Sequence, residues 1–346
     1  MYYLKYRPQT LTDLDNSHVR EKIQHLLQSK DIPHALLFVG QKGMGKTSTA
    51  RIVAKALNCL QNAFAGVGKS YEPCNECENC VAITKGYSPD VIEQDAASNR
   101  GIDEVRKLIK EVGFAPMTSK RRIYIIDEAH MITSDAFNAL LKTLEEPPEH
   151  VVFILATTNE EKLPRTIISR CVRIPFGRAE KKDILHMLAR IAKEEKIKLP
   201  DEVAELIAQS SDYAFRDAAK LFEELVVQNK LTIDEAKQYI GIHGRKSLLE
   251  VMGKEDMQTC MQWIEDFTAN GGNVRYEMES MLQSLKNQLL LKSNISTDEK
   301  DLGFTQKDIV FLMKELHDAL EMLRIAPIPA IPLEIVVAEF YNNANR

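Results

Sequence analysis

Residues 40–47 read Gly-Gln-Lys-Gly-Met-Gly-Lys-Thr, a complete G-x4-G-K-T phosphate-binding loop. An apolar run at 35–39 predicts a buried strand before the loop, and 47–57 predicts a helix after it. In that context glycines let backbone amides turn toward phosphate oxygens, and the helix N-terminus adds its positive dipole. The alternative, a glycine turn before an ordinary helix, does not require this spacing. The motif therefore predicts a nucleotide-binding α/β fold.

The remaining pattern supports a parallel sheet. Short apolar runs alternate with amphipathic helical stretches, which is typical of βαβ units with helices on both faces of the sheet. Further strands are predicted at 90–94, 123–126, 151–156 and 171–175, and helices at 102–112 and 137–144. After about residue 177 the strand signal disappears and the chain reads as helical.

The chain of 346 residues has room for two or three domains. The change from alternating strands and helices to helices alone divides it into an α/β domain at 1–178, a small helical domain at 179–241 and a second helical domain at 242–346. A cysteine-rich insertion at about 59–80 interrupts the first domain.

Charge and hydropathy narrow the possible partners. The formal net charge is -5, so any nucleic-acid contact must come from a local basic surface. The longest apolar stretches are too short to cross a bilayer, and the N-terminus has no apolar signal region. We therefore expect a cytoplasmic protein with no membrane partner.

Two carboxylates follow the strand at 123–126. Asp127 and Glu128 stand where α/β sheets place their ligands, at the carboxyl end of a strand. Asp127 is expected to hold Mg²⁺ together with the Thr47 hydroxyl, while Lys46 reaches the β- and γ-phosphates. Glu128 would orient and deprotonate the attacking water, so the pair favours an ATPase over a passive nucleotide binder. The alternative is a solvated acid pair at a strand end.

Four of the six cysteines are clustered: Cys59, Cys74, Cys77 and Cys80. In a reducing compartment such a cluster indicates a metal site rather than disulfides. Four thiolates satisfy a tetrahedral Zn²⁺ with no open position, which is typical of a structural site. An iron–sulfur cluster and free thiols are the alternatives, and the absence of the usual fourth Cys-Pro favours zinc.

These motifs together resemble the gamma/tau subunits of the bacterial DNA polymerase III clamp loader, which are AAA+ ATPases. The similarity covers most of the chain and is strongest over 1–180. Besides the loop and the cysteines, it is carried by the segments 5–8, 95–101, 127–130, 137–148, 156–158 and 169–171. The resemblance implies an AAA+ domain, a helical lid and a helical collar for oligomerisation.

The resemblance also assigns residue roles. Thr158 is similar to the first sensor near the γ-phosphate, and Arg216 to the second sensor on the lid. Arg170 matches the arginine finger that reaches the ATP site of an adjacent subunit. The nucleotide-binding set implied by motif and family together is Tyr6, Arg7, Gly40, Gly43, Gly45, Lys46, Thr47, Ser48 and Arg216. The chain departs from the family pattern at 10–19, where a different adenine-side pocket is expected.

The same resemblance implies ATP-driven loading of a sliding clamp onto primed DNA, with ATP, Mg²⁺ and Zn²⁺ as cofactors. The implied partners are delta and delta-prime subunits, further copies of this chain, the clamp, and primer–template DNA bound without sequence preference. Arg100, just before the helix at 102–112, and Lys142 are the candidate DNA contacts.

Three other functions fit parts of the pattern. A structural clamp-loader subunit that does not hydrolyse ATP, like delta-prime, is disfavoured by the intact Lys46 and acid pair. A replication factor C-type small subunit is disfavoured by the cysteine insertion. Residues 127–130 spell Asp-Glu-Ala-His, as in a DEAH helicase, but the chain has a single phosphate-loop core.

Overall fold

The computed structural model describes residues 1–29, 31–98, 101–240, 247–269, 271–293, 301–323 and 325–344. The chain forms two compact units, 1–226 and 227–346, which are described separately. The three-part division into 1–178, 179–241 and 242–346 stays a prediction.

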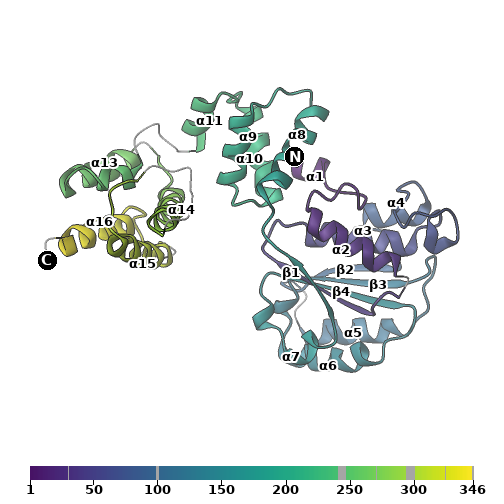
Figure 1. Cartoon of the computed structure of the whole chain (residues 1–346). Coiled ribbons are helices and arrows are strands. Elements are labelled where there is room, and N and C mark those ends of the chain that lie inside the picture. Colours follow the sequence, from purple (N-terminus) through teal and green to yellow (C-terminus); the bar gives the residue numbers. More distant parts are fainter. Residues whose placement is uncertain are drawn as a thin grey trace. The chain divides into compact units, whose positions relative to one another are not determined.

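The first unit is built on a sheet of five parallel strands in the order β2-β3-β4-β1-β5 (Figure 1). The strands are β1 (Ala35–Gly40), β2 (Val91–Asp95), β3 (Arg122–Asp127), β4 (Val151–Thr157) and β5 (Val172–Phe176). All five predicted strands are confirmed, with ends shifted by at most one residue. Because β1 pairs with β4 and β4 with β3, the phosphate loop and the acid pair follow strands separated only by β4.

Helices cover both faces of the sheet (Figure 1). Successive residues of a strand point to opposite faces, so Leu36 and Phe38 join one hydrophobic core while Leu37 joins the other. The first core includes α2 (Ser17–Gln28) and α3 (Lys46–Asn58). The second includes α5 (Ile102–Val112), α6 (Ser134–Glu145) and α7 (Arg165–Ile168). Burial on both faces explains why the central strands are continuously apolar.

The first unit also contains helices that do not cover the sheet. These are α1 (Tyr2–Lys5), α4 (Glu78–Lys85), α8 (Lys181–Glu194), α9 (Asp201–Ser210) and α10 (Phe215–Val227). Two contacts connect α8 to the segment before α2: Asp15 accepts hydrogen bonds from His186 Nδ1 at 2.9 Å and from Arg190 Nη2 at 2.6 Å. The helical stretch after the sheet is thus tied to the α/β part near the start of α2.

The second unit is helical over the residues that the structure describes. Its helices are α11 (Ile233–Ile240), α12 (Leu248–Met252), α13 (Met257–Ala269), α14 (Val274–Lys292), α15 (Gln306–Met322) and α16 (Ile331–Ala344). Helices α12 to α16 share one hydrophobic core, in which Met278 and Met281 are buried and Trp263 is partly buried. Trp263, Met278 and Met281 therefore belong to the packing of this unit. In the described ranges of the whole chain, none of the helices has the length and apolar character that a bilayer crossing requires.

Candidate nucleotide-binding site and cysteine cluster

A cleft of about 610 Å³ opens at the carboxyl ends of the strands, between the phosphate loop and helices α8 and α10. Its lining includes the N-terminal segment, the loop with the start of α3, and the acid pair after β3. Residues from α8 and α10 line it as well. Of the predicted site residues it holds Tyr6, Arg7, Gly43, Gly45, Lys46, Thr47, Ser48, Asp127, Glu128 and Arg216.

The glycines of the loop are required by its conformation. Gly43 and Gly45 have φ of 84° and 88°, in the left-handed region that side chains disfavour. Gly40 ends β1, where an added Cβ would lie 2.1 Å from the backbone oxygen of Phe176. The first glycine of the motif therefore permits close approach of β1 and β5, while the other two form the turn.

We expect Gly40→Ala to lower the free energy of unfolding by about 2 kcal/mol, because a strand backbone must move to make room for the methyl group. Urea unfolding followed by circular dichroism measures this change. Gly113→Ala is the matched control, since Gly113 has helical φ and nothing lies within 4 Å of its added Cβ. Equal unfolding midpoints for the two variants would contradict the close approach at Gly40.

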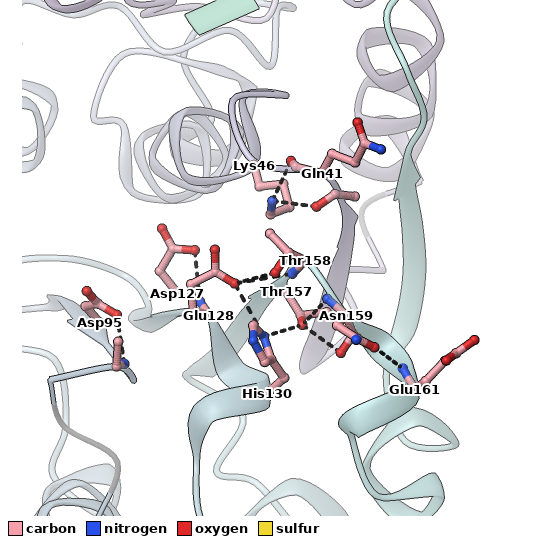
Figure 2. A network of polar contacts seen from close by, with 12 residues as sticks. Gln41, Lys46, Asp95, Asp127, Glu128, His130, Thr157, Thr158, Asn159 and Glu161 are labelled. Atoms are coloured by element: carbon pink, nitrogen blue, oxygen red, sulfur yellow. Dashed lines mark hydrogen bonds and ion pairs between the residues drawn. The ribbon is translucent and has the colours of Figure 1, made fainter. Parts of the chain in front are cut away.

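The Lys46 ammonium lies inside the loop. Its Nζ donates to the carbonyl oxygens of Gly40 at 2.7 Å and Gln41 at 2.8 Å, and the side chain is buried (Figure 2). Burial lowers the pKa of Lys46, while the nearby Glu128 and Asp127 oppose that shift. A buried cation at the base of a phosphate loop is suited to bind a polyanion.

The two residues expected to hold Mg²⁺ are in direct contact. Thr47 Oγ1 donates to Asp127 Oδ2 at 2.5 Å, joining the start of α3 to the end of β3. Asp95, at the end of the neighbouring strand β2, lies opposite Asp127 in the sheet register and also lines the cleft. Hydroxyl and carboxylate oxygens are the ligands that Mg²⁺ prefers, so this pair fits the ion.

Glu128 is held by a polar network at the ends of β3 and β4 (Figure 2). Its Oε2 accepts hydrogen bonds from Thr158 Oγ1 at 3.0 Å and from the Thr158 amide at 3.3 Å. The same Oε2 lies 3.4 Å from His130 Nδ1, which is 3.0 Å from Thr157 Oγ1. Glu128 itself has a φ of 48°, an uncommon conformation for a side-chain-bearing residue that is often found at functional sites. The predicted first sensor thus touches the predicted base.

Arg216 lies in the first turn of α10, beside the phosphate loop. Its backbone amide donates to the Gly43 carbonyl at 3.4 Å, and its guanidinium lies 4.9 Å from the centre of the Tyr3 ring. Asp212 and Tyr213 have positive φ and form the turn before α10, which begins at Phe215. The predicted second sensor therefore lies at the cleft.

The N-terminal segment places Tyr6 and Arg7 at the same cleft. The Tyr6 hydroxyl donates to Glu195 just after α8 at 2.6 Å. Arg7 Nε donates to Ser48 Oγ at 2.8 Å, so the guanidinium stem is fixed on the residue that follows Thr47. Tyr6 and Arg7 therefore both line the cleft, and their contact with a nucleotide stays a prediction.

Among the predicted residues that the structure describes, Gly40, Thr158, Arg170 and Lys142 do not line this cleft. Arg170 is not among the described residues that line it; the guanidinium forms an ion pair with Glu145 at the end of α6 and donates to the Thr166 carbonyl at 2.6 Å. Lys142 is exposed beside a groove between α5 and α6. Arg100 lies outside the described residues.

Sequence reasoning missed the α8 side of the cleft. Met187, Arg190 and Ile191 line it together with Leu14 and Val19 from the segment around α2. These residues carry no motif, because they occur in ordinary amphipathic helices. The departure of residues 10–19 from the family pattern was the available signal, since that segment supplies part of the lining.

The four clustered cysteines converge at the end of α3. Their Sγ atoms all lie within 4.8 Å of one another, and the distance from Cys74 Sγ to Cys80 Sγ is 4.0 Å. Zn–S bonds of about 2.3 Å place the sulfurs of a tetrahedral site about 3.8 Å apart, so the arrangement fits a metal ion of this kind. Cys171 and Cys260 are separate from this group.

Backbone amides point at two of these sulfurs. Cys59 Sγ accepts from the amides of Gln61 and Cys74 at 3.4 Å, and Cys74 Sγ accepts from those of Cys77 at 3.2 Å and Glu76 at 3.5 Å. Burial opposes ionisation of Cys74, but these hydrogen bonds outweigh it and lower the pKa to about 7. At Cys74 the local backbone therefore stabilises the thiolate, the form that binds metals, whereas burial raises the pKa of Cys59 and Cys80.

Phosphate loop, acid pair and sheet order define the chain as a P-loop nucleotide-binding protein of the AAA+ class. The solved structures agree on the fold: RuvB of Thermotoga maritima superposes with a TM-score of 0.51 at 15% sequence identity, covering 78% of this chain and 86% of that one.

The family follows from sequence comparison. This chain belongs to the family of DNA polymerase III gamma/tau subunits. It is 31% identical to the subunit gamma of Buchnera aphidicola over 98% of its own length and 95% of that protein. It is 39% identical to the subunit tau of Bacillus subtilis and 36% to that of Escherichia coli, over 84% and 90% of its length.

The extent of these matches differs along the relatives and along this chain. The chain spans about half the length of the Bacillus and Escherichia relatives, 52% and 48%. A sequence model of the related family described as "DNA polymerase III, delta subunit" matches residues 15–180.

Proposed function

We propose that the chain hydrolyses ATP to drive the loading of a sliding clamp onto primed DNA. The observation that carries the proposal is the convergence of the phosphate loop, Lys46 and the pair Asp127–Glu128 in one cleft. A passive binder needs the loop and the cation, whereas Glu128, held near the loop by Thr158, is the group that hydrolysis requires.

The proposed roles follow from the contacts. Lys46 and the loop amides bind the β- and γ-phosphates of ATP, while Thr47 and Asp127 hold Mg²⁺, which neutralises phosphate charge. Glu128 accepts a proton from the attacking water, and Thr158 orients that carboxylate. Arg216 on α10 and the pair Tyr6–Arg7 enclose the nucleotide from the side opposite the sheet.

Zinc is the proposed metal of the cysteine cluster. Four sulfur ligands without an open position favour Zn²⁺ in a structural role. Metal analysis of the purified chain should find about one zinc per chain, and iron in its place would contradict the proposal.

The proposed assembly contains other copies of this chain together with delta and delta-prime subunits in the cytoplasm. Arg170 then completes the ATP site of a neighbour, which is in keeping with its location outside the cleft of its own chain. The helical core of α12 to α16 is the proposed collar, and 179–241 the proposed lid. Arg100 and Lys142 remain candidate contacts to the primer–template backbone.

The deciding experiment measures ATP hydrolysis by the chain with its delta-type partners, with and without clamp and primed DNA. Clamp and DNA together are expected to stimulate hydrolysis, since they align the subunits. Turnover that is unaffected by clamp and DNA would contradict clamp loading. Strand unwinding without a clamp would instead support the DEAH helicase alternative.

Lys46→Ala is expected to weaken ATP binding about 100-fold, because it removes charge-assisted hydrogen bonds worth about 3 kcal/mol. Fluorescence titration with an ATP analogue measures the dissociation constant. The control is Lys162→Ala, an exposed lysine outside the cleft. If both variants bind like the wild type, Lys46 does not contact the phosphates.

A further inference from the structure

The chemistry of the cleft does not use the cysteine module, here defined as residues 59–80. None of its described residues lines the cleft. The module nevertheless makes specific contacts to the N-terminal segment, residues 1–12, which does line the cleft. These contacts suggest what the module does for the nucleotide site.

The first contact is made by Glu72. Its two carboxylate oxygens accept hydrogen bonds from the backbone amides of Leu11 at 2.8 Å and Thr12 at 3.2 Å. Glu72 stands two residues before Cys74, so the position of the carboxylate depends on the fold of the module. A carboxylate that accepts two adjacent amides fixes both the position and the orientation of that backbone.

The second contact passes through a buried cation. Lys55 is 1% exposed, and its ammonium donates to three oxygens: Gln9 O at 2.7 Å, Gln9 Oε1 at 2.8 Å and Asn75 Oδ1 at 2.7 Å. Three acceptors satisfy all three ammonium protons. Asn75 lies between Cys74 and Cys77 with a φ of 60°, a conformation that asparagine tolerates. Lys55 therefore joins the metal-ligand turn to Gln9.

From Gln9 the connection continues into the cleft. Gln9 Nε2 donates to the Arg7 carbonyl at 3.1 Å, and Arg7 Nε donates to Ser48 Oγ. At the other end, α1 rests on the helices of the first unit: the Tyr2 amide donates to Glu223 at 2.9 Å, and the Tyr3 ring contacts Arg216. The N-terminal segment is thus held at one end by the cysteine module and at the other by α10, with Tyr6 and Arg7 between.

We propose that the cysteine module is the anchor of the N-terminal segment, and that metal binding by its four cysteines is thermodynamically coupled to ATP binding through Glu72 and Lys55. With the module ordered by zinc, Arg7 and Tyr6 are held in the cleft before ATP arrives, and less entropy is lost on binding. Without the metal the segment is released and ATP must order it. Glu72 and Lys55 are positioning residues, and the inference rests on ATP being the ligand of the cleft.

The experiment measures the Kd of a fluorescent ATP analogue with the full chain. Zinc-loaded wild type is compared with Glu72→Ala, Lys55→Met and chain stripped of zinc by a chelator under reducing conditions. Each of the three should bind about 10-fold more weakly. Glu72→Gln keeps one acceptor oxygen and should fall between wild type and Glu72→Ala. The matched controls Glu76→Ala and Lys85→Met remove exposed charges of the same kind nearby and should bind like the wild type.

A thermodynamic cycle that combines zinc removal with substitution of the anchor distinguishes coupling between zinc and ATP binding from a general loss of folding. Stripping zinc from the double variant Glu72→Ala/Lys55→Met should change the Kd by less than about twofold, because both contacts of the anchor are already cut. Coupling is reciprocal, so the saturating analogue should tighten zinc binding, measured by competition with a chromophoric chelator, about 10-fold in wild type. Amides 11 and 12 should exchange hydrogen faster in Glu72→Ala.

The outcomes are distinct. If zinc-loaded wild type does not bind the analogue, the proposed function fails. If wild type binds and both Glu72→Ala and Lys55→Met bind equally well, the anchor is refuted while the proposed function stands. Weak binding by the stripped chain alone, with no effect of the analogue on zinc affinity, would mean that the metal only supports folding and would also refute the coupling.

Discussion

Glu128→Gln should slow ATP hydrolysis about 1000-fold in the complete assembly, within the range contributed by a general base. Glutamine has nearly the same shape and keeps an oxygen that can accept the hydrogen bonds from Thr158. The substitution therefore removes proton acceptance while the cleft keeps its shape. Single-turnover hydrolysis with clamp and primed DNA measures the rate, and the Kd for ATP should stay within about threefold of wild type.

Glu149→Gln is the control for this experiment, because Glu149 is an exposed carboxylate outside the cleft. It should hydrolyse ATP at the wild-type rate. Rapid hydrolysis by Glu128→Gln would exclude Glu128 as the base. Loss of ATP binding by that variant would show instead that the Glu128–Thr158 contact supports the pocket itself.

Arg170→Ala should leave ATP binding by the isolated chain unchanged but reduce hydrolysis in the assembly about 1000-fold, as expected for an arginine finger. The physical reason is geometric: Arg170 is held by Glu145 and Thr166, outside the cleft of its own chain. In the proposed assembly its guanidinium stabilises developing phosphate charge in a neighbouring subunit. Binding and turnover, measured on the same preparations, separate the two effects.

Mixing variants tests the action between subunits. An Arg170→Ala subunit still supplies Glu128, and a Glu128→Gln subunit still supplies Arg170, so assemblies containing both should regain part of the lost activity. Arg165→Ala, an exposed arginine on α7, is the matched control and should be fully active. Mixed assemblies that stay inactive, or weaker ATP binding by isolated Arg170→Ala, would contradict a role in the neighbouring site.

Much of the fold was predictable because its signals are local. The strand–loop–helix pattern around 35–57 and the apolar run before Asp127 require only neighbouring residues, and both lie where predicted. The cysteine cluster was equally evident, since three of its members occur within seven residues. The roles of Thr158, Arg170 and Arg216 came from resemblance, because a single threonine or arginine has no pattern of its own.

The amino-acid sequence alone determined the type of chemistry: a loop that can hold phosphate, a cation and two acids, and four sulfurs for a metal. These features depend on short-range geometry, so they can be recognised in the sequence without knowing how the chain packs. Only the tertiary structure decided which distant segments share the site. Leu11 meets Glu72, 61 residues away, and Tyr2 meets Glu223, 221 residues away. Such contacts depend on how helices pack on a finished sheet, and isolated glutamates and backbone amides give no sign of them beforehand.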